Sequence, residues 1–151
     1  MGSRSKRVLI VEDDTDLAES LAEFLTDRGH HVAVAENGRD AVSCAGAWDF
    51  DVVFMDVRMP VMNGVDSFFA IKSIKPQLRV VMMTGYRESI VERAIQGGAE
   101  GPLYKPFDVE EMLAMVDGAH AKLSLQPGNR PLPSPPPRAT RTAQAPSRTI
   151  H

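Results

Sequence analysis

The sequence has a single cysteine and no apolar run of membrane-spanning length. The lone Cys44 excludes an intrachain disulfide, and its apolar neighbours favour a buried position on a helix. A membrane span needs roughly 18–20 consecutive apolar residues, and no run approaches that length. The basic start of the chain is not followed by the long apolar segment of a secretory signal. Together these absences favour a cytoplasmic protein that does not insert into a membrane, because a reducing compartment suits a chain with one thiol.

Acidic residues are missing from one end of the chain. Residues 124–151 carry four arginines and seven of the eleven prolines but no acid. The formal net charge is -3 for the whole chain, so residues 1–123 carry a net charge of about -7. A nucleic-acid-binding domain would normally show a basic patch, so we expect no specific DNA binding by this chain. An acidic body is compatible with a site that binds a metal cation.

Composition divides the chain into three segments. Residues 1–6 are interpreted as an N-terminal extension or the remnant of an expression tag. Residues 7–123 have the apolar content of one folded domain. Residues 124–151, rich in proline and arginine, bury too little apolar surface to offset the entropy of ordering and are expected to be a disordered tail. The run Pro135-Pro136-Pro137 leaves a proline-rich binding ligand open as the alternative.

Five short apolar runs alternate with five segments of helical periodicity in the folded domain. The expected strands are 8–11, 31–35, 52–55, 79–83 and 102–104, and the expected helices are 15–28, 38–47, 64–74, 88–97 and 108–123. Continuous apolar strands separated by helices indicate a parallel sheet covered on both faces. Five strands are too few to close an eight-stranded barrel. The predicted fold class is therefore α/β, a doubly wound open parallel sheet with helices on both faces.

Polar side chains follow four of these strands, whose carboxyl ends should meet at one edge of the sheet. They are Glu12, Asp13 and Asp14 after the first strand, Asp56 after the third, Thr84 after the fourth and Lys105 after the fifth. Carboxylates this close repel one another unless a cation lies between them. All-oxygen ligands suit Mg²⁺, and without His or Cys in the set a zinc site is disfavoured. A metal ion, an ammonium and a hydroxyl around one carboxylate can hold a phosphoryl group.

The same residues resemble the receiver domain of two-component response regulators, the CheY-like superfamily, over residues 7–123. The stretch "VLIVEDD" looks like the first strand and acidic pair of that family, and "DVRMPVMNG" looks like its phosphoacceptor loop. The stretches "MMTGY" and "KPF" carry the switch hydroxyl and the lysine. The resemblance implies a flavodoxin-like receiver fold with strand order 2-1-3-4-5. It also implies that Asp56 accepts phosphate from a histidine kinase or a histidine phosphotransfer protein.

The resemblance implies a metal site at the phosphoacceptor. Asp13 and Asp56 would bind Mg²⁺ directly, with Mn²⁺ as a substitute. The main-chain carbonyl of Arg58 would be a third ligand, and Glu12 would act through water. Mg²⁺ and Lys105 are expected to lower the pKa of Asp56 and keep it an ionised nucleophile.

The remaining roles concern the phosphoryl group itself. Thr84 would bind a phosphoryl oxygen, and Lys105 would pair with the phosphate after a cis Lys105–Pro106 bond. The bulky side chains of Arg58 and Tyr86 flank the site and are expected to slow dephosphorylation by limiting water access.

Signal output is expected on the face made by helix 88–97, strand 102–104 and helix 108–123, where a downstream output protein would bind. A homodimer is compatible with the sequence. The family usually has Tyr or Phe three residues before the lysine, and this aromatic turns inward as the hydroxyl moves. Here that position is Pro102, which has no side chain able to swing, and Tyr104 is not expected to replace it.

Two other interpretations compete with a phosphorylatable signalling module that is not an enzyme. A pseudo-receiver would serve only as a protein-binding scaffold, which the complete set of acids, Thr84 and Lys105 argues against. A Mg²⁺-dependent phosphatase of the haloacid dehalogenase type also uses an aspartyl nucleophile. That class needs a second acid two residues after the first, and here the position is Arg58. The signalling module itself fits a single-domain regulator, a phosphate shuttle or a fragment of a larger regulator.

Overall fold

The structure is a computed structural model, and it describes residues 5–118. The predicted tail at 124–151 and residues 119–123 of the last predicted helix lie outside the described residues. Strands and helices alternate along the chain as predicted. The strands are β1 (Arg7–Val11), β2 (His31–Ala35), β3 (Val52–Asp56), β4 (Arg79–Thr84) and β5 (Glu100–Tyr104). The helices are α1 (Thr15–Asp27), α2 (Gly38–Ala47), α3 (Gly64–Ile74), α4 (Ser89–Gln96) and α5 (Val109–Val116).

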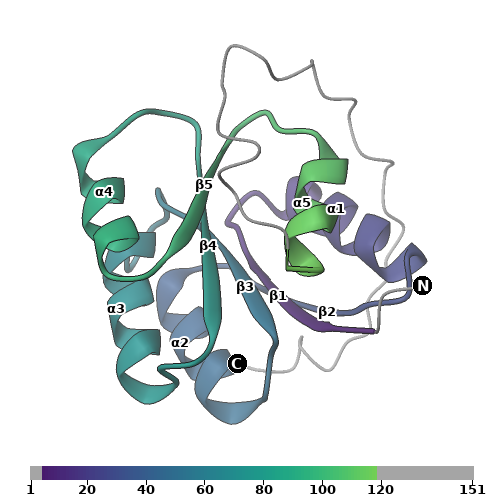
Figure 1. The fold of residues 1–151 in the computed structure, drawn as a ribbon, viewed down its shortest axis with the longest axis horizontal. Coiled ribbons are helices and arrows are strands. Elements are labelled where there is room, and N and C mark those ends of the chain that lie inside the picture. The colour runs from purple at the N-terminus through teal and green to yellow at the C-terminus, as the bar shows by residue number, and fades with distance from the viewer. Residues whose placement is uncertain (1–4, 119–151) are drawn as a thin grey trace.

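All five strands lie in one parallel sheet with the order β2-β1-β3-β4-β5. This confirms the predicted fold class and strand order. β3 is central, and all five of its residues are buried. Figure 1 shows α1 and α5 on one side of the sheet and α2, α3 and α4 on the other.

Alternation along each strand builds two separate cores. In β1, Val8 and Ile10 pack with α1 and α5, whereas Leu9 and Val11 pack with α2, α3 and α4. All four are fully buried, so this strand is apolar on both faces, as its sequence predicted. Cys44 lies buried in the second core, and burial raises the pKa of its thiol to about 12, which fits an inert residue.

Side chains cap four of the five helices at their N-termini, because each helix begins with amide groups that lack partners inside the helix. Asp14, Asn37, Asn63 and Asp108 each accept a hydrogen bond from a main-chain amide of the following turn. α4 differs, because its N-cap residue Glu88 makes no capping hydrogen bond through its side chain.

β5 begins at Glu100, two residues earlier than the sequence predicted. Gly101 has a φ of +95°, and a Cβ atom there would lie 2.8 Å from the carbonyl oxygen of Met82. This close approach explains why a glycine interrupts the apolar pattern. The Gly101–Pro102 peptide is cis, and the pairing with β4 shifts register between Val81 and Met83. β5 is the edge strand of the sheet, and a proline is tolerated there because its missing amide does not interrupt the pairing of two neighbours.

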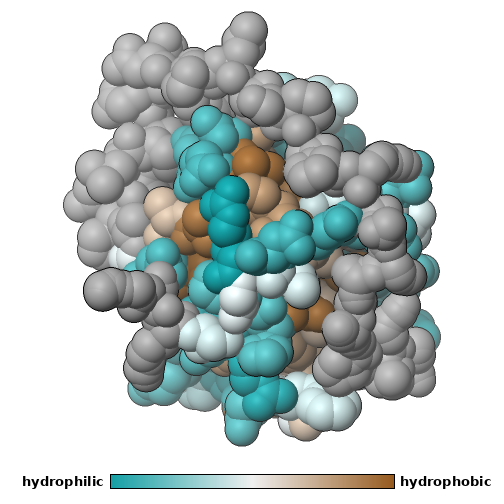
Figure 2. Space-filling model, turned by 90° about the vertical axis from the view of Figure 1, so that its right-hand side faces the viewer, coloured by the Kyte–Doolittle hydropathy of each residue, from teal (hydrophilic) through white to brown (hydrophobic). Residues whose placement is uncertain are grey.

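The side of the molecule that carries α1 and α5 is mixed in character. Figure 2 shows apolar residues between hydrophilic ones on this side. Leu17, Val34 and Leu113 pack against the core there while only partly buried. Within residues 5–118, no helix is long and apolar enough to cross a membrane.

Candidate functional site

Three carboxylates meet at the carboxyl ends of β1 and β3, as the sequence predicted. One carboxylate oxygen from each of Glu12, Asp13 and Asp56 lies within 4.8 Å of the other two. Asp56 is the last residue of the central strand and is 5% exposed, Glu12 is buried, and Asp13 is exposed. Asp14 instead caps α1 by accepting a hydrogen bond from the Leu17 amide. The cluster therefore consists of Glu12, Asp13 and Asp56.

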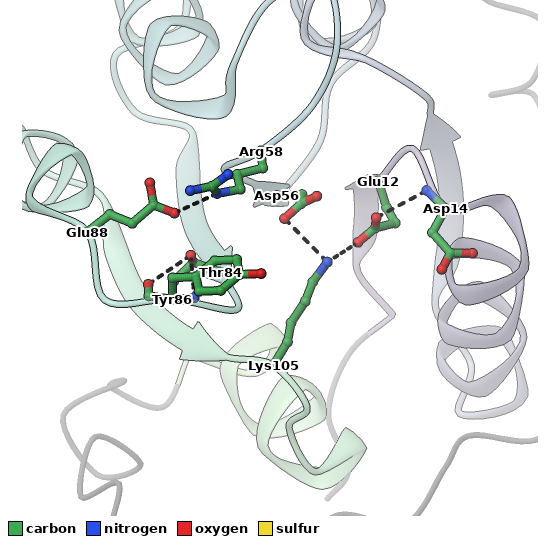
Figure 3. Close-up of polar contacts among 8 residues, drawn as sticks. All are labelled: Glu12, Asp14, Asp56, Arg58, Thr84, Tyr86, Glu88 and Lys105. Atoms are coloured by element: carbon green, nitrogen blue, oxygen red, sulfur yellow. Dashed lines mark hydrogen bonds and ion pairs between the residues drawn. The ribbon is translucent and has the colours of Figure 1, made fainter.

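Lys105 places its ammonium group against two of these carboxylates (Figure 3). Its Nζ lies 2.6 Å from Oε1 of Glu12 and 3.3 Å from Oδ1 of Asp56. The Lys105 amide donates to the carbonyl of Thr84, which fixes the end of β5 beside the end of β4. The peptide after the lysine, Lys105–Pro106, is cis, as predicted.

The pKa values of the buried acids and of Lys105 are shifted by burial and by the neighbouring charges. Burial raises the pKa of Glu12, and the hydrogen bond from Lys105 only partly offsets this. Burial also raises the pKa of Asp56, the attraction of Lys105 opposes it, and the charge of Asp13 adds to it. The expected lowering of the Asp56 pKa by Lys105 is therefore outweighed here. Burial acts against the charged form of Lys105, but Glu12 and Asp56 together raise its pKa.

This donor set fits a hard divalent cation. The cluster holds three carboxylates but only two of them are paired with the one ammonium group of Lys105, so the site carries excess negative charge, and its ligand atoms are all oxygens. The raised pKa values of Glu12 and Asp56 mean that ionising both buried acids costs free energy, which a nearby cation would offset. Oxygen ligands of this kind suit Mg²⁺, and also Mn²⁺.

Thr84, the last residue of β4, is 1% exposed, and its hydroxyl is already hydrogen-bonded. Its Oγ1 donates to the Tyr86 carbonyl oxygen at 3.0 Å and accepts from the Tyr86 amide at 3.2 Å. The hydroxyl therefore lies at the carboxyl end of the strands, as predicted, but it is hydrogen-bonded to the main chain of the loop that follows β4.

Arg58 has side-chain contacts that the sequence did not predict. Its Nε donates to Oε2 of Glu88 at 2.9 Å, and its Cζ lies 4.8 Å from the centroid of the Tyr86 ring. The hydrogen bond that Arg58 donates to Glu88 is the main cause of the raised pKa of Arg58, and Asp56 contributes through its charge. These residues come from loops after two different strands, so their contact depends on the assembled sheet.

Pro102 occupies β5 and is partly buried, where the family resemblance places an aromatic residue. Its neighbour Leu103 packs into the core beneath α1 and α5, so strand alternation places Pro102 and Tyr104 on the α4 side. The guanidinium carbon of Arg87 lies 5.5 Å from the centroid of the Tyr104 ring. Tyr104 therefore shares a face of β5 with the position that lacks the aromatic.

Comparison with known sequences identifies the family of this chain. The family "Response regulator receiver domain" matches residues 8–117. A response regulator receiver protein of Anaeromyxobacter is 38% identical over 109 residues, covering 72% of this chain and 46% of that protein. The transcriptional regulatory protein TcrA of Mycobacterium tuberculosis is 32% identical over 132 residues, covering 86% of this chain and 49% of that protein. The chain thus spans about half the length of such curated relatives.

Solved structures give the same result. A response regulator from Burkholderia pseudomallei, described with a phosphorylated aspartic acid, a calcium ion and citrate, aligns with a TM-score of 0.73 at 27% identity, covering 82% of this chain and 73% of that one. Chemotaxis protein CheY4 of Vibrio cholerae aligns with a TM-score of 0.69 at 30% identity, covering 75% of this chain and 97% of that one. The chain belongs to the response regulator receiver domain family of two-component signalling.

Proposed function

We propose that this chain receives a phosphoryl group on Asp56 from a histidine kinase or histidine phosphotransfer protein and transmits the change to an output partner. The observation that carries the proposal is the cluster of Glu12, Asp13 and Asp56 with Lys105 paired to two of its members. The phosphorylated aspartic acid and calcium ion described for the Burkholderia relative support it.

In this proposal an oxygen of the Asp56 carboxylate attacks phosphorus, and the bond between phosphorus and the donor histidine nitrogen breaks. The bonding electron pair stays on the imidazole nitrogen, so the donor leaves as histidine. Lys105 offsets negative charge on the transferred group, and Thr84 donates its hydroxyl hydrogen to a phosphoryl oxygen. To do this Thr84 must give up its hydrogen bond to the Tyr86 carbonyl.

Asp13, Asp56 and the main-chain carbonyl of Arg58 are the proposed direct ligands of Mg²⁺ or Mn²⁺, with Glu12 acting through water. The bound ion would supply positive charge that neutralises the phosphoryl oxygens during transfer. The face of α4, β5 and α5 is the proposed surface for the output protein. The Arg58 and Tyr86 side chains, in cation–π contact at 4.8 Å, are expected to slow dephosphorylation by limiting water access to Asp56.

Incubation with acetyl phosphate and Mg²⁺, followed by intact mass spectrometry, tests the proposal. Wild type should gain the mass of one phosphoryl group, and Asp56→Asn should gain none. A gain on both proteins would place the phosphoryl group on another residue, and a gain on neither would favour the scaffold interpretation; either result would contradict the proposal. Sustained turnover of a small phosphate ester would instead favour the phosphatase, although Arg58 stands where that class needs an acid.

A further inference from the structure

Arg58 joins the phosphoacceptor loop to the start of α4. It lies two residues after Asp56, and its Nε donates to Oε2 of Glu88 at 2.9 Å. Glu88 is the N-cap residue of α4, yet its side chain makes no hydrogen bond to the amides of that helix. The Glu88 side chain is 20% exposed and that of Arg58 is 65% exposed. The Glu88 carboxylate is therefore occupied by Arg58 and does not cap its own helix.

The same guanidinium covers the segment that holds Thr84. Its Cζ lies 4.8 Å from the centroid of the Tyr86 ring, a cation–π contact. The main chain of Tyr86 in turn makes both hydrogen bonds to the Thr84 hydroxyl. Any movement of Thr84 toward a phosphoryl group must loosen the main chain of Tyr86, so Arg58 and Thr84 are linked through one residue.

Phosphorylation of Asp56 would give the Arg58 guanidinium a second acidic group to bind. Figure 3 shows Arg58 lying between Glu88 and Asp56, with its guanidinium turned toward Glu88. A phosphoryl group on Asp56 would add up to about one net negative charge and new acceptor oxygens at that position. Guanidinium binds phosphoryl oxygens strongly and with defined geometry. Glu88 and the phosphoryl group would then compete for one cation.

In the family, a Tyr or Phe on the last strand turns inward as the hydroxyl moves. In this chain Pro102 stands at that position of β5, so no such aromatic side chain can respond. Arg58 lies two residues after Asp56 and is paired with Glu88 at the start of α4, so it connects the phosphoacceptor loop to that helix without the aromatic residue.

We propose that Arg58 and Glu88 form a latch that phosphorylation of Asp56 opens. Arg58 moves from Glu88 to the phosphoryl oxygens, which releases the Tyr86 segment and lets Thr84 turn toward the phosphoryl group. The freed Glu88 carboxylate then interacts with the N-terminus of α4, where negative charge is favourable, and α4 shifts. This inference rests on the proposed function, and Arg58 acts as a positioning residue.

Beryllofluoride with Mg²⁺, a stable mimic of the phosphoryl group, tests the latch by NMR on the full chain. The amides of α4 and the Arg58 Nε–H signal should both shift when wild type binds it. Glu88→Gln removes the competing acid and should bind the mimic about threefold more tightly, whereas Arg58→Gln removes the cation and should bind it about threefold more weakly. In Arg58→Gln, which frees the Glu88 carboxylate, the α4 amides should already lie partway toward their bound positions without the mimic.

A matched control is Asp49→Asn, which removes the exposed acid of the Lys75–Asp49 pair (3.2 Å); Asp49 lies before β3, at the other end of the sheet. It should leave both the affinity and the α4 amides unchanged. Affinities of Glu88→Gln and Arg58→Gln that change in the same direction, or an Arg58 signal that does not respond in wild type, would overturn the latch. If wild type fails to bind the mimic with Mg²⁺ at all, the proposed function itself is wrong.

Discussion

At the scale of single residues, Val61 stands out because its backbone is left-handed. Its φ is +71°, the sole positive value at a non-glycine residue within 5–118, and its side chain is 66% exposed. This conformation costs a residue with a Cβ atom roughly 1–2 kcal/mol. Glycine avoids that cost, but its greater conformational entropy in the unfolded chain lowers the stability of the protein by roughly 0.5–1 kcal/mol. Val61→Gly should therefore stabilise the protein by about 0.5–1 kcal/mol in urea unfolding. Val61→Ala keeps a Cβ atom and is the control, so equal stability of the two variants would contradict the account.

His30 makes stability depend on pH. It is 5% exposed, its Nδ1 accepts a hydrogen bond from the Lys6 amide at 3.0 Å, and burial lowers its pKa, with the charge of Asp117 opposing. The unfolded chain therefore binds a proton at this residue more readily than the folded chain. The stabilisation is present above the usual histidine pKa of about 6.5 and is lost as the pH falls through the lowered folded value.

Replacing His30 by asparagine keeps an acceptor but removes the titration. Urea unfolding at about pH 7.5 and about pH 5.5 should show a smaller loss of stability on acidification in His30→Asn than in wild type. The neighbouring exposed residue supplies the control His31→Asn, which should keep the wild-type dependence. A His30→Asn variant as sensitive to pH as wild type would show that this residue is not the cause.

At the scale of elements, α3 begins in direct contact with the phosphoacceptor strand. A Cβ atom at Gly64 would lie 2.2 Å from the carbonyl oxygen of Asp56, so a larger residue must push α3 away from β3. Gly64→Ala should destabilise the protein by about 1–3 kcal/mol and weaken Mg²⁺ binding. Gly46→Ala in α2 is the matched control, because its Cβ atom would meet only Ile74 Cδ1 at 3.5 Å. That change should stabilise the protein by about 0.5–1 kcal/mol, and a Gly64→Ala variant of equal stability would contradict the predicted contact.

The elements themselves were largely predictable from sequence, because their signals are local. Runs such as Val52 to Met55 are apolar on both faces, and Asp108 supplies the capping side chain of the last helix. The start of β5 was missed, because Glu100 lacks an apolar pattern and is instead held by Arg79 of β4 at 2.7 Å. That partner lies 21 residues away, so the contact needs the assembled sheet.

In the candidate site, too, some features are predictable from local sequence and others depend on the assembled fold. Residues that follow strand ends were predictable, since parallel strands bring their carboxyl ends to one edge. Arg58 and Glu88 are 30 residues apart and lie in two different loops, so no local sequence pattern predicts their contact. The raised pKa of Asp56 was also missed, because it depends on how deeply the packed chain buries the carboxylate.

At the scale of the whole molecule, the acidic cluster should link stability, pH and metal binding. Because the pKa values of Glu12 and Asp56 are raised, the folded chain binds protons more readily than the unfolded chain above their usual range. Without metal, this contribution to stability therefore falls as the pH rises from about 4 through the raised folded values. A cation that binds the ionised cluster should recover that loss.

Thermal unfolding with and without Mg²⁺ checks this linkage. At about pH 7.5, Mg²⁺ at roughly ten times its dissociation constant should stabilise the protein by about 1.4 kcal/mol. The gain should shrink at about pH 5, because protons compete with the metal for the carboxylates. Asp13→Asn should lose most of the gain at both pH values. A gain that persists in this variant, or that does not depend on pH, would place the metal elsewhere.

Chemical trapping can show whether the Asp56 carboxylate carries the phosphoryl group. Borohydride reduces an aspartyl phosphate to homoserine, and tandem mass spectrometry locates the converted residue. After treatment with a small phosphodonor and Mg²⁺, homoserine is predicted at position 56 of wild type. Conversion at Asp13 or at any other aspartate, or no conversion at all, would contradict the account.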